Sequence, residues 1–164
     1  MRLKKQNGFT MMELLIVTVI IGLIAAMAVP DFVKSMQKLR WHGTGTDVMT
    51  SLRLARSYAI SQQRQFGVVF DTSSNHITVF KDLVNPTAFT FEYGDSVVAQ
   101  DSIEAKFDWF WASFTSGAVC FFPNGRASES GYIMASQYSD ELYQMLSISV
   151  LAATGRVAID YVEN

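Results

Sequence analysis

The stretch from Lys4 to Phe32, KKQNGFTMMELLIVTVIIGLIAAMAVPDF, decides the architecture of the N-terminal part of this chain. Basic residues come first, a long apolar run follows, and one carboxylate, Glu13, stands inside that run. A carboxylate at membrane depth costs roughly 2.5–3.5 kcal/mol on insertion scales. Glu13 is therefore a candidate functional residue, because placing it in lipid requires a compensating partner.

The apolar run is long enough to cross a membrane as a helix. Phe9 to Pro30 spans 22 residues, which as a helix reach about 33 Å and match the hydrocarbon core of a bilayer. Arg2, Lys4 and Lys5 precede the run, and the positive-inside rule keeps them on the cytoplasmic side. The residues after Pro30 are then expected on the outer side.

Two interpretations of this segment are open, a cleaved secretory signal peptide and a retained helix. Ala26-Met27-Ala28 matches the small-residue pattern of a signal-peptidase site. A signal peptide has no use for Glu13 in its hydrophobic region, and helical spacing continues beyond the site at Phe32, Val33, Met36 and Leu39. Pro30 bends such a helix without necessarily ending it. We expect the helix to be retained.

The segment Lys4–Pro30 resembles the class III signal of type IV pilins and type II secretion pseudopilins. In that family a prepilin peptidase cleaves after a glycine, which implies Gly8 here. The same enzyme methylates the new amino terminus, which implies N-methylphenylalanine at Phe9. The glutamate at the fifth mature position of the family corresponds to Glu13, which is thought to meet the terminal amine of a neighbouring subunit.

The resemblance gives Glu13 a physical role. Cleavage after Gly8 creates an ammonium group at Phe9, at the head of the apolar helix. Opposite charges attract strongly where the dielectric constant is low, and pairing offsets the desolvation of each charge. The alternative is that the Glu13 side chain only extends to the lipid headgroups from one turn inside the helix.

The residues after the apolar run predict a helix break and a second helix. RWHGTGTD, Arg40–Asp47, contains two glycines and is expected to break or loosen the helix. Thr46 or Asp47 can cap a second helix over 46–64. One apolar stripe follows, at Val48, Leu52, Ala55 and Ala59. Three arginines lie off this stripe and are expected to form a solvated face, with a phosphate contact surface as the alternative: Arg53, Arg56 and Arg64.

Short runs with strand-like patterns fill the rest of the chain. They cover 66–70 and 76–80 (a hairpin through DTSSN), 88–93, 117–128 (ending in a Pro-Asn-Gly turn), 131–136, and 143–152 and 155–162 (a hairpin through ATG). The segment 102–114 is ambiguous, because Phe110 interrupts its alternation. Strands separated by turns, without intervening helices, indicate antiparallel pairing.

The predicted fold class is therefore α+β: a long N-terminal helix, transmembrane and then amphipathic, packed on an antiparallel β-rich globular domain. The expected organisation is a leader at 1–8, a helix at 9–40 whose transmembrane half is 9–30, and a globular domain at 41–164.

Three later stretches resemble the GspH/FimT group of minor pseudopilins and minor pilins. They are LRLARSYAISQQRQFGVVF at 52–70, CFFPNGRAS at 120–128 and LSISVLAATGRVAIDY at 146–161. Some FimT-type members bind DNA through a Gly-Arg-x-Arg element. This chain has Gly155 and Arg156, but Ala158 stands in place of the second arginine. Arg156 is thus a candidate for a weak DNA contact only.

The resemblance implies a non-enzymatic minor pilin or pseudopilin that initiates assembly of a type II secretion pseudopilus or a type IV pilus. The alternative is a DNA-binding minor pilin for natural transformation. The implied partners are the prepilin peptidase/N-methyltransferase, other minor and major pilins or pseudopilins, and the inner-membrane assembly platform. The implied location is the inner membrane, crossed once, with the globular domain in the periplasm and incorporation near a filament tip.

Composition narrows the classes of function further. The formal net charge is −2, which argues against broad nucleic-acid binding because that requires clustered Lys and Arg. The single cysteine, Cys120, excludes an internal disulfide and is expected to be a buried thiol. His42 and His76 are expected at the surface, and no catalytic constellation, metal site or cofactor is predicted. Trp109 and Trp111 are expected to pack in the core or on a sheet face, with a partner-binding patch as the alternative.

Overall fold

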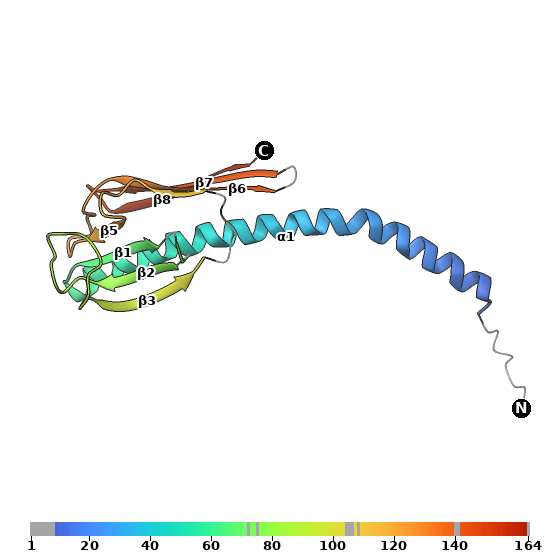
Figure 1. The fold of residues 1–164 in the computed structure, drawn as a ribbon, viewed down its shortest axis with the longest axis horizontal. Helices are drawn as coiled ribbons and strands as arrows, with labels where there is room; N and C mark the ends of the chain where they lie inside the picture. The colour runs from blue at the N-terminus through green and yellow to red at the C-terminus, as the bar shows by residue number, and fades with distance from the viewer. Residues whose placement is uncertain are drawn as a thin grey trace, which may run out of the picture. The chain divides into compact units, whose positions relative to one another are not determined.

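The computed structural model describes residues 9–71, 73–74, 76–103, 107, 109–139 and 142–163. The chain divides into two compact units, Met1–Leu39 and Arg40–Asn164, and each is described by itself. Helix α1, Met11–Gln62, contributes its first part to one unit and its last part to the other (Figure 1).

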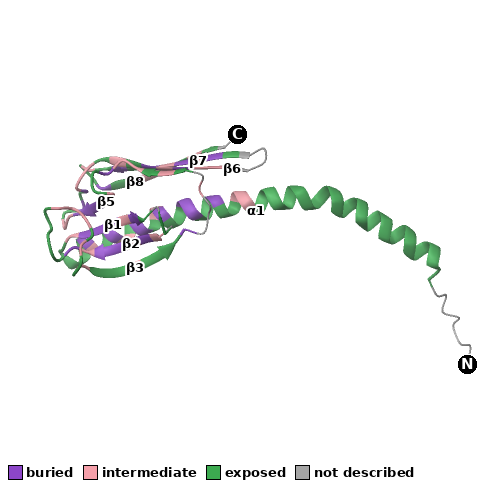
Figure 2. Cartoon of the chain, viewed as in Figure 1, coloured by how far each residue is buried: buried purple, intermediate pink, exposed green. Residues whose placement is uncertain are grey.

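The first unit consists, in its described residues, of the start of α1 and the two residues before it. Every residue from 9 to 36 is exposed (Figure 2). The helix passes through Pro30 and continues to Leu39, so the prediction that Pro30 does not end it is confirmed. Such a long exposed apolar surface marks a contact with a membrane or with other protein.

The predicted break at Arg40–Asp47 is wrong, because α1 runs through it without interruption. Neither Thr46 nor Asp47 begins a helix. The Thr46 hydroxyl donates a hydrogen bond of 2.9 Å to the carbonyl of His42, one turn earlier in the same helix. The helix predicted at 46–64 is therefore the last part of α1.

Burial explains why this glycine-containing stretch stays helical. Trp41 and Gly45 are buried. A Cβ added at Gly45 would lie 2.5 Å from Tyr161 Oη and 2.7 Å from Ile159 Cδ1. The glycine thus lets side chains of β8 (Arg156–Glu163) pack directly on the helix, and this packing outweighs a propensity cost of about 1 kcal/mol.

The predicted apolar stripe of this part of α1 is confirmed. Val48 is 1% exposed and Leu52, Ala55 and Ala59 are fully buried. They join one core cluster with apolar side chains from both sheets. Burial of this stripe holds the last part of α1 against the strands.

The first sheet is antiparallel and has the order β3-β2-β1-β5 within the described residues. Its strands are β1 Phe66–Asp71, β2 His76–Lys81, β3 Ser96–Ser102 and β5 Ala118–Phe121. The predicted β1–β2 hairpin is confirmed. Asp71 organises its turn by accepting hydrogen bonds from the backbone N–H groups of Ser73 (2.8 Å) and Ser74 (3.2 Å).

The second sheet is also antiparallel, with the order β4-β6-β7-β8. Its strands are β4 Trp109–Ala112, β6 Gly131–Ser139, β7 Leu142–Leu151 and β8 Arg156–Glu163. The predicted β7–β8 hairpin is confirmed, and the ambiguous segment 102–114 contains β4. The α+β prediction, a long helix packed on antiparallel strands, is therefore confirmed.

The strand predicted at 88–93 is wrong, and β3 lies further along the chain. The Asp95 carboxylate accepts three backbone hydrogen bonds, from Leu83, Val84 and Glu92. These bonds fold the segment before Asp95 into turns, and Phe89 adopts a positive φ of 55°. The aromatic residues of 88–93 serve packing rather than pairing, since Phe91 lies edge-on to Phe80 at 5.2 Å.

Cys120 and the two tryptophans occupy different environments. Cys120 is fully buried with Phe80 and Ala118, as predicted. Trp109 and Trp111 are not core residues: they are 47% and 43% exposed, and their rings stack at 6.3 Å on a face of the second sheet.

Candidate functional site

The start of α1 is organised by Thr10, a residue that sequence reasoning overlooked. Thr10 Oγ1 accepts a hydrogen bond of 3.2 Å from the Glu13 backbone N–H. The Thr10 carbonyl accepts from the Leu14 N–H at 3.2 Å, which is the first bond of the helix. The pattern Thr-x-x-Glu at a helix start is a capping-box signature, and it would have identified Thr10.

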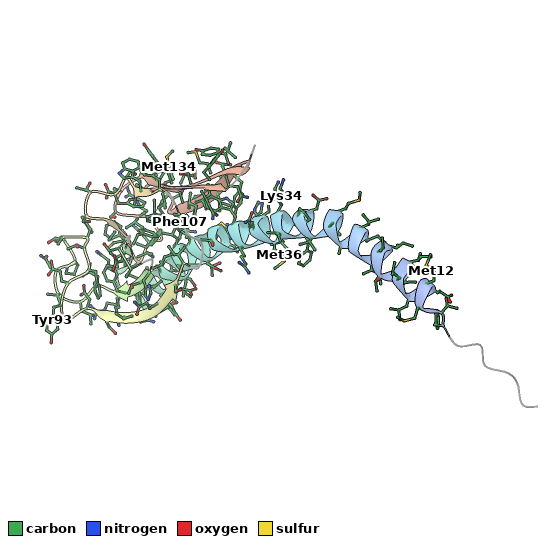
Figure 3. The ribbon with its side chains drawn as sticks, turned by 45° about the vertical axis from the view of Figure 1, so that its right-hand side comes forward. Met12, Lys34, Met36, Tyr93, Phe107 and Met134 are labelled. Carbon is green, nitrogen blue, oxygen red and sulfur yellow. The ribbon has the colours of Figure 1, made fainter. Side chains whose placement is uncertain are left out.

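Glu13 therefore lies in the first turn of α1, where a negative charge is favoured by the helix dipole. Its neighbours along the helix are exposed apolar side chains, among them Met12, which projects from the first turn in Figure 3. Phe9 is 80% exposed and directly precedes the capping residue. Gly8 lies outside the described residues.

The same helix is long and apolar enough to cross a membrane, judged by length and composition within the described residues. The apolar window lies near the N-terminus and is uncovered by other residues. A core helix of a globular domain would instead be mostly buried. The exposed part of α1 thus has the properties of a membrane anchor.

Arg56 is the second organised feature, and it departs from the predicted solvated face, whereas Arg53 and Arg64 are exposed as predicted. Its Nε donates to the carbonyl of Gly125 at 3.0 Å, and its Nη2 donates to the carbonyl of Thr154 at 2.9 Å. Gly125 belongs to the turn after β5 and Thr154 to the β7–β8 turn. Arg56 therefore connects α1 to a turn of each sheet.

Gly155 completes this junction. Its φ of +59° favours glycine, and a Cβ at this position would collide with the carbonyl oxygen of Gly125. Arg156 follows at the start of β8 and is exposed. The structure brings Arg156 near Arg53 and Arg56, because these three residues line one hollow of about 470 Å³. Sequence spacing did not reveal this juxtaposition.

The residues that could support catalysis are not brought together. The His42 ring lies against Tyr161 with the ring centroids 4.3 Å apart and the planes tilted by 55°, and His76 Nδ1 lies 2.8 Å from the carbonyl oxygen of Ser74. The pKa of the Cys120 thiol is raised to about 12, mainly because the thiol is buried. The thiol therefore stays protonated at neutral pH. The described part of the chain contains no group of three or more His, Cys, Asp or Glu arranged to hold a metal ion.

One buried carboxyl has a perturbed titration. Asp82 is 4% exposed, and its Oδ2 accepts a hydrogen bond of 2.9 Å from Gln65 Nε2. Its Oδ1 has no hydrogen-bond partner among the described residues. Desolvation raises the pKa of Asp82, and the charge of Asp95 raises it further.

Comparison with solved structures defines the class of fold. The minor pilin FimU of Pseudomonas aeruginosa superposes with a TM-score of 0.57 at 15% identity, over 73% of this chain and 87% of that one. The minor pseudopilin EpsH from the type 2 secretion system of Vibrio cholerae superposes with a TM-score of 0.53 at 12% identity, over 71% of this chain and 92% of that one. The chain has a pilin-like fold.

Family models identify the chain more closely. The model for the type II transport protein GspH matches residues 44–154, and the prokaryotic N-terminal methylation motif matches residues 3–29. The chain belongs to the GspH family, whose members are minor pilins and pseudopilins of type IV pili or type II secretion. No curated protein matches the sequence.

Proposed function

We propose that this protein is a structural, non-enzymatic subunit that helps to initiate a pilus or pseudopilus. Residues 9–30 anchor it in the inner membrane, the globular domain lies in the periplasm, and the subunit is incorporated near the filament tip. The observation that carries this proposal is the methylation motif at 3–29, which contains the capped start of an exposed apolar helix at Thr10 and Met11.

Processing is the first step of the proposed function. A prepilin peptidase cleaves after Gly8 and methylates the amine of Phe9. Cleavage removes Arg2, Lys4 and Lys5, which leaves 10 Lys and Arg against 15 Asp and Glu. The new cation at Phe9 then stands at the head of the helix, four residues before Glu13.

Assembly is the second step, and Glu13 is its central residue. In a filament core of packed apolar helices, an unpaired ammonium is strongly unfavourable. The Glu13 carboxylate of one subunit neutralises the Phe9 amine of a neighbour and thereby sets the register between the two helices. Other minor and major subunits and the inner-membrane assembly platform are the proposed partners.

Substitution of Glu13→Val tests this proposal. Insertion in the membrane should be unharmed, because the change removes an acid from lipid. Cleavage after Gly8 should persist, because it precedes assembly. Stranding the amine typically costs 3–5 kcal/mol, a roughly 150- to 5,000-fold change in the docking equilibrium. The variant should accumulate as processed membrane-bound monomer and be depleted from sheared filaments.

A matched control is Thr18→Val, which introduces the same side chain at another exposed position of the same helix. The control should assemble normally. Wild-type amounts of Glu13→Val in sheared filaments or in cross-linked subunit complexes would contradict the pairing. The glutamate would then only extend to the headgroups.

A further inference from the structure

The hollow beside Arg156 is formed by the last part of α1 and by the start of β8. Its lining comes from Met49, Arg53 and Arg56 on the helix and from residues 155–159. We call it the arginine groove. β8 is the last strand of its sheet and pairs with β7 alone among the described strands. The main-chain groups on the other side of β8 therefore have no strand partner among the described residues, and such an edge is a template for an added strand.

The arginine groove carries positive charge without an internal counterion. Arg53 and Arg56 are three residues apart and share a helix face, and Arg156 faces the same hollow. None of the lining residues is acidic. Arg56 is fixed by the two turn carbonyls, whereas the structure shows no hydrogen bond or ion pair of the Arg53 and Arg156 side chains to described residues.

This charge distribution indicates the chemistry of a ligand. The chain is acidic overall, with a formal charge of −2, so a cluster of guanidinium groups is a local exception. Guanidinium groups bind carboxylates and phosphates through parallel hydrogen bonds. The hollow also has an apolar component from Met49, Val157 and Ile159, which suits a segment that carries apolar as well as acidic side chains.

An extended acidic segment satisfies all of these features together. Its main chain pairs with the free edge of β8, as in strand addition to other sheets. Its side chains alternate between two faces, so every second residue can present a carboxylate to Arg53 or Arg156. Duplex DNA is a poorer match, because Ala158 supplies no cation two residues after Arg156 and a duplex has no peptide main chain to pair with the edge of β8.

We propose that the arginine groove binds an extended acidic segment of a neighbouring protein subunit by strand addition to β8, with carboxylates on Arg53 and Arg156. The nature of the partner as a filament subunit rests on the function proposed above. The recognition of an acidic strand does not, so the two claims can fail separately.

The test uses the full-length protein in detergent and a fluorescent ten-residue peptide of alternating Glu and Val. Anisotropy at low salt should show saturable binding with Kd below about 1 mM. The double variant Arg53→Gln/Arg156→Gln should weaken binding by at least about tenfold, because each arginine makes charge-assisted bonds. Ala158→Glu should also weaken it, since it places a carboxylate of the chain itself at the groove.

Two controls isolate the groove from net charge. Arg64→Gln/Arg126→Gln removes the same charge from exposed arginines outside the groove and should bind the peptide like the wild type. A Gln-Val peptide of the same length should not bind. Thermal unfolding of each variant verifies that the fold is retained.

Three outcomes would overturn the proposal. They are absence of binding to the acidic peptide, binding that Arg53→Gln/Arg156→Gln leaves unchanged, and tighter groove-dependent binding of a 20-base-pair DNA duplex than of the peptide. If one of these outcomes occurs while Glu13→Val still shows the expected assembly defect, the proposal for the arginine groove is refuted and the proposed function of the protein is not.

Discussion

Asp82 is a carboxyl whose charge the fold does not compensate. One of its oxygens accepts from Gln65, and the other has no partner among the described residues. Its pKa is raised, first by desolvation and then by Asp95. A raised folded-state pKa means that the protonated form stabilises the fold below the unfolded-state pKa of about 3.9. That contribution is lost as the pH rises through the folded-state value.

We therefore expect Asp82→Asn to increase thermal stability at pH 7, because asparagine still accepts from Gln65 and carries no charge. The gain should shrink as the pH falls towards 4. Melting curves of the full chain between pH 4 and pH 8, followed by tryptophan fluorescence, measure it. Asp160→Asn is the control, since it removes an exposed carboxylate and should change stability little. An equal gain in stability for Asp82→Asn at every pH would contradict a raised pKa of Asp82.

Two glycines in α1 make a matched pair for the helix as an element. A Cβ added at Gly43 would meet open space, whereas a Cβ at Gly45 would contact Tyr161 and Ile159. Gly43→Ala should raise the free energy of unfolding by about 0.5–1 kcal/mol, because alanine has the better helix propensity. Gly45→Ala should lower it by about 1–3 kcal/mol, the usual result of overpacking.

Thermal unfolding of the two alanine variants compares these effects directly. Both substitutions change helix propensity equally, so the difference between them reports the contact of the helix with β8. Similar stabilisation by both alanines would show that β8 does not pack on Gly45. The helix would then owe its continuity to another cause.

Sequence patterns predicted the elements that depend on local chemistry. The apolar stripe of α1, the β1–β2 and β7–β8 hairpins and the buried Cys120 follow from side-chain periodicity and turn residues. The helix break at Arg40–Asp47 was predicted wrongly, because tertiary burial of Gly45 overrides local propensity. The strand predicted at 88–93 was wrong for another reason, because Asp95 accepts backbone hydrogen bonds that fold that segment into turns.

The candidate site likewise contains residues that the sequence reveals and contacts that only the structure reveals. Phe9 and Glu13 are visible in sequence because their spacing is local, and their roles remain proposals. The contacts of Arg56 with Gly125 and Thr154 join residues 69 and 98 positions apart. No periodicity records such pairs, so the clustering of arginines around the groove required the structure.

The charge of the molecule as a whole predicts its behaviour towards DNA. The proposed processing after Gly8 would leave a formal side-chain charge of −5, from 10 basic and 15 acidic residues. We expect the full-length protein to bind a 20-base-pair duplex no better than about 10⁻⁴ M at physiological salt, the weak end of non-specific binding. Fluorescence anisotropy over a salt series measures this affinity.

Ala158→Arg is the informative companion variant, because it restores the Gly-Arg-x-Arg spacing after Gly155. It should bind the duplex more tightly than the wild type and with a steeper salt dependence. Micromolar binding by the wild type, lost in Arg156→Ala, would instead favour a DNA-binding minor pilin.

The proposal that this protein is a membrane-held pilin subunit is tested most directly by the first residue of the mature protein. Intact-mass measurement and N-terminal peptide sequencing of the protein extracted from membranes of its native host determine that residue and its modification. We predict a chain that begins at Phe9 with a methylated amine. A chain that begins at Val29, after cleavage behind Ala28, would contradict a retained pilin helix, because the apolar segment and Glu13 would then be absent from the mature protein.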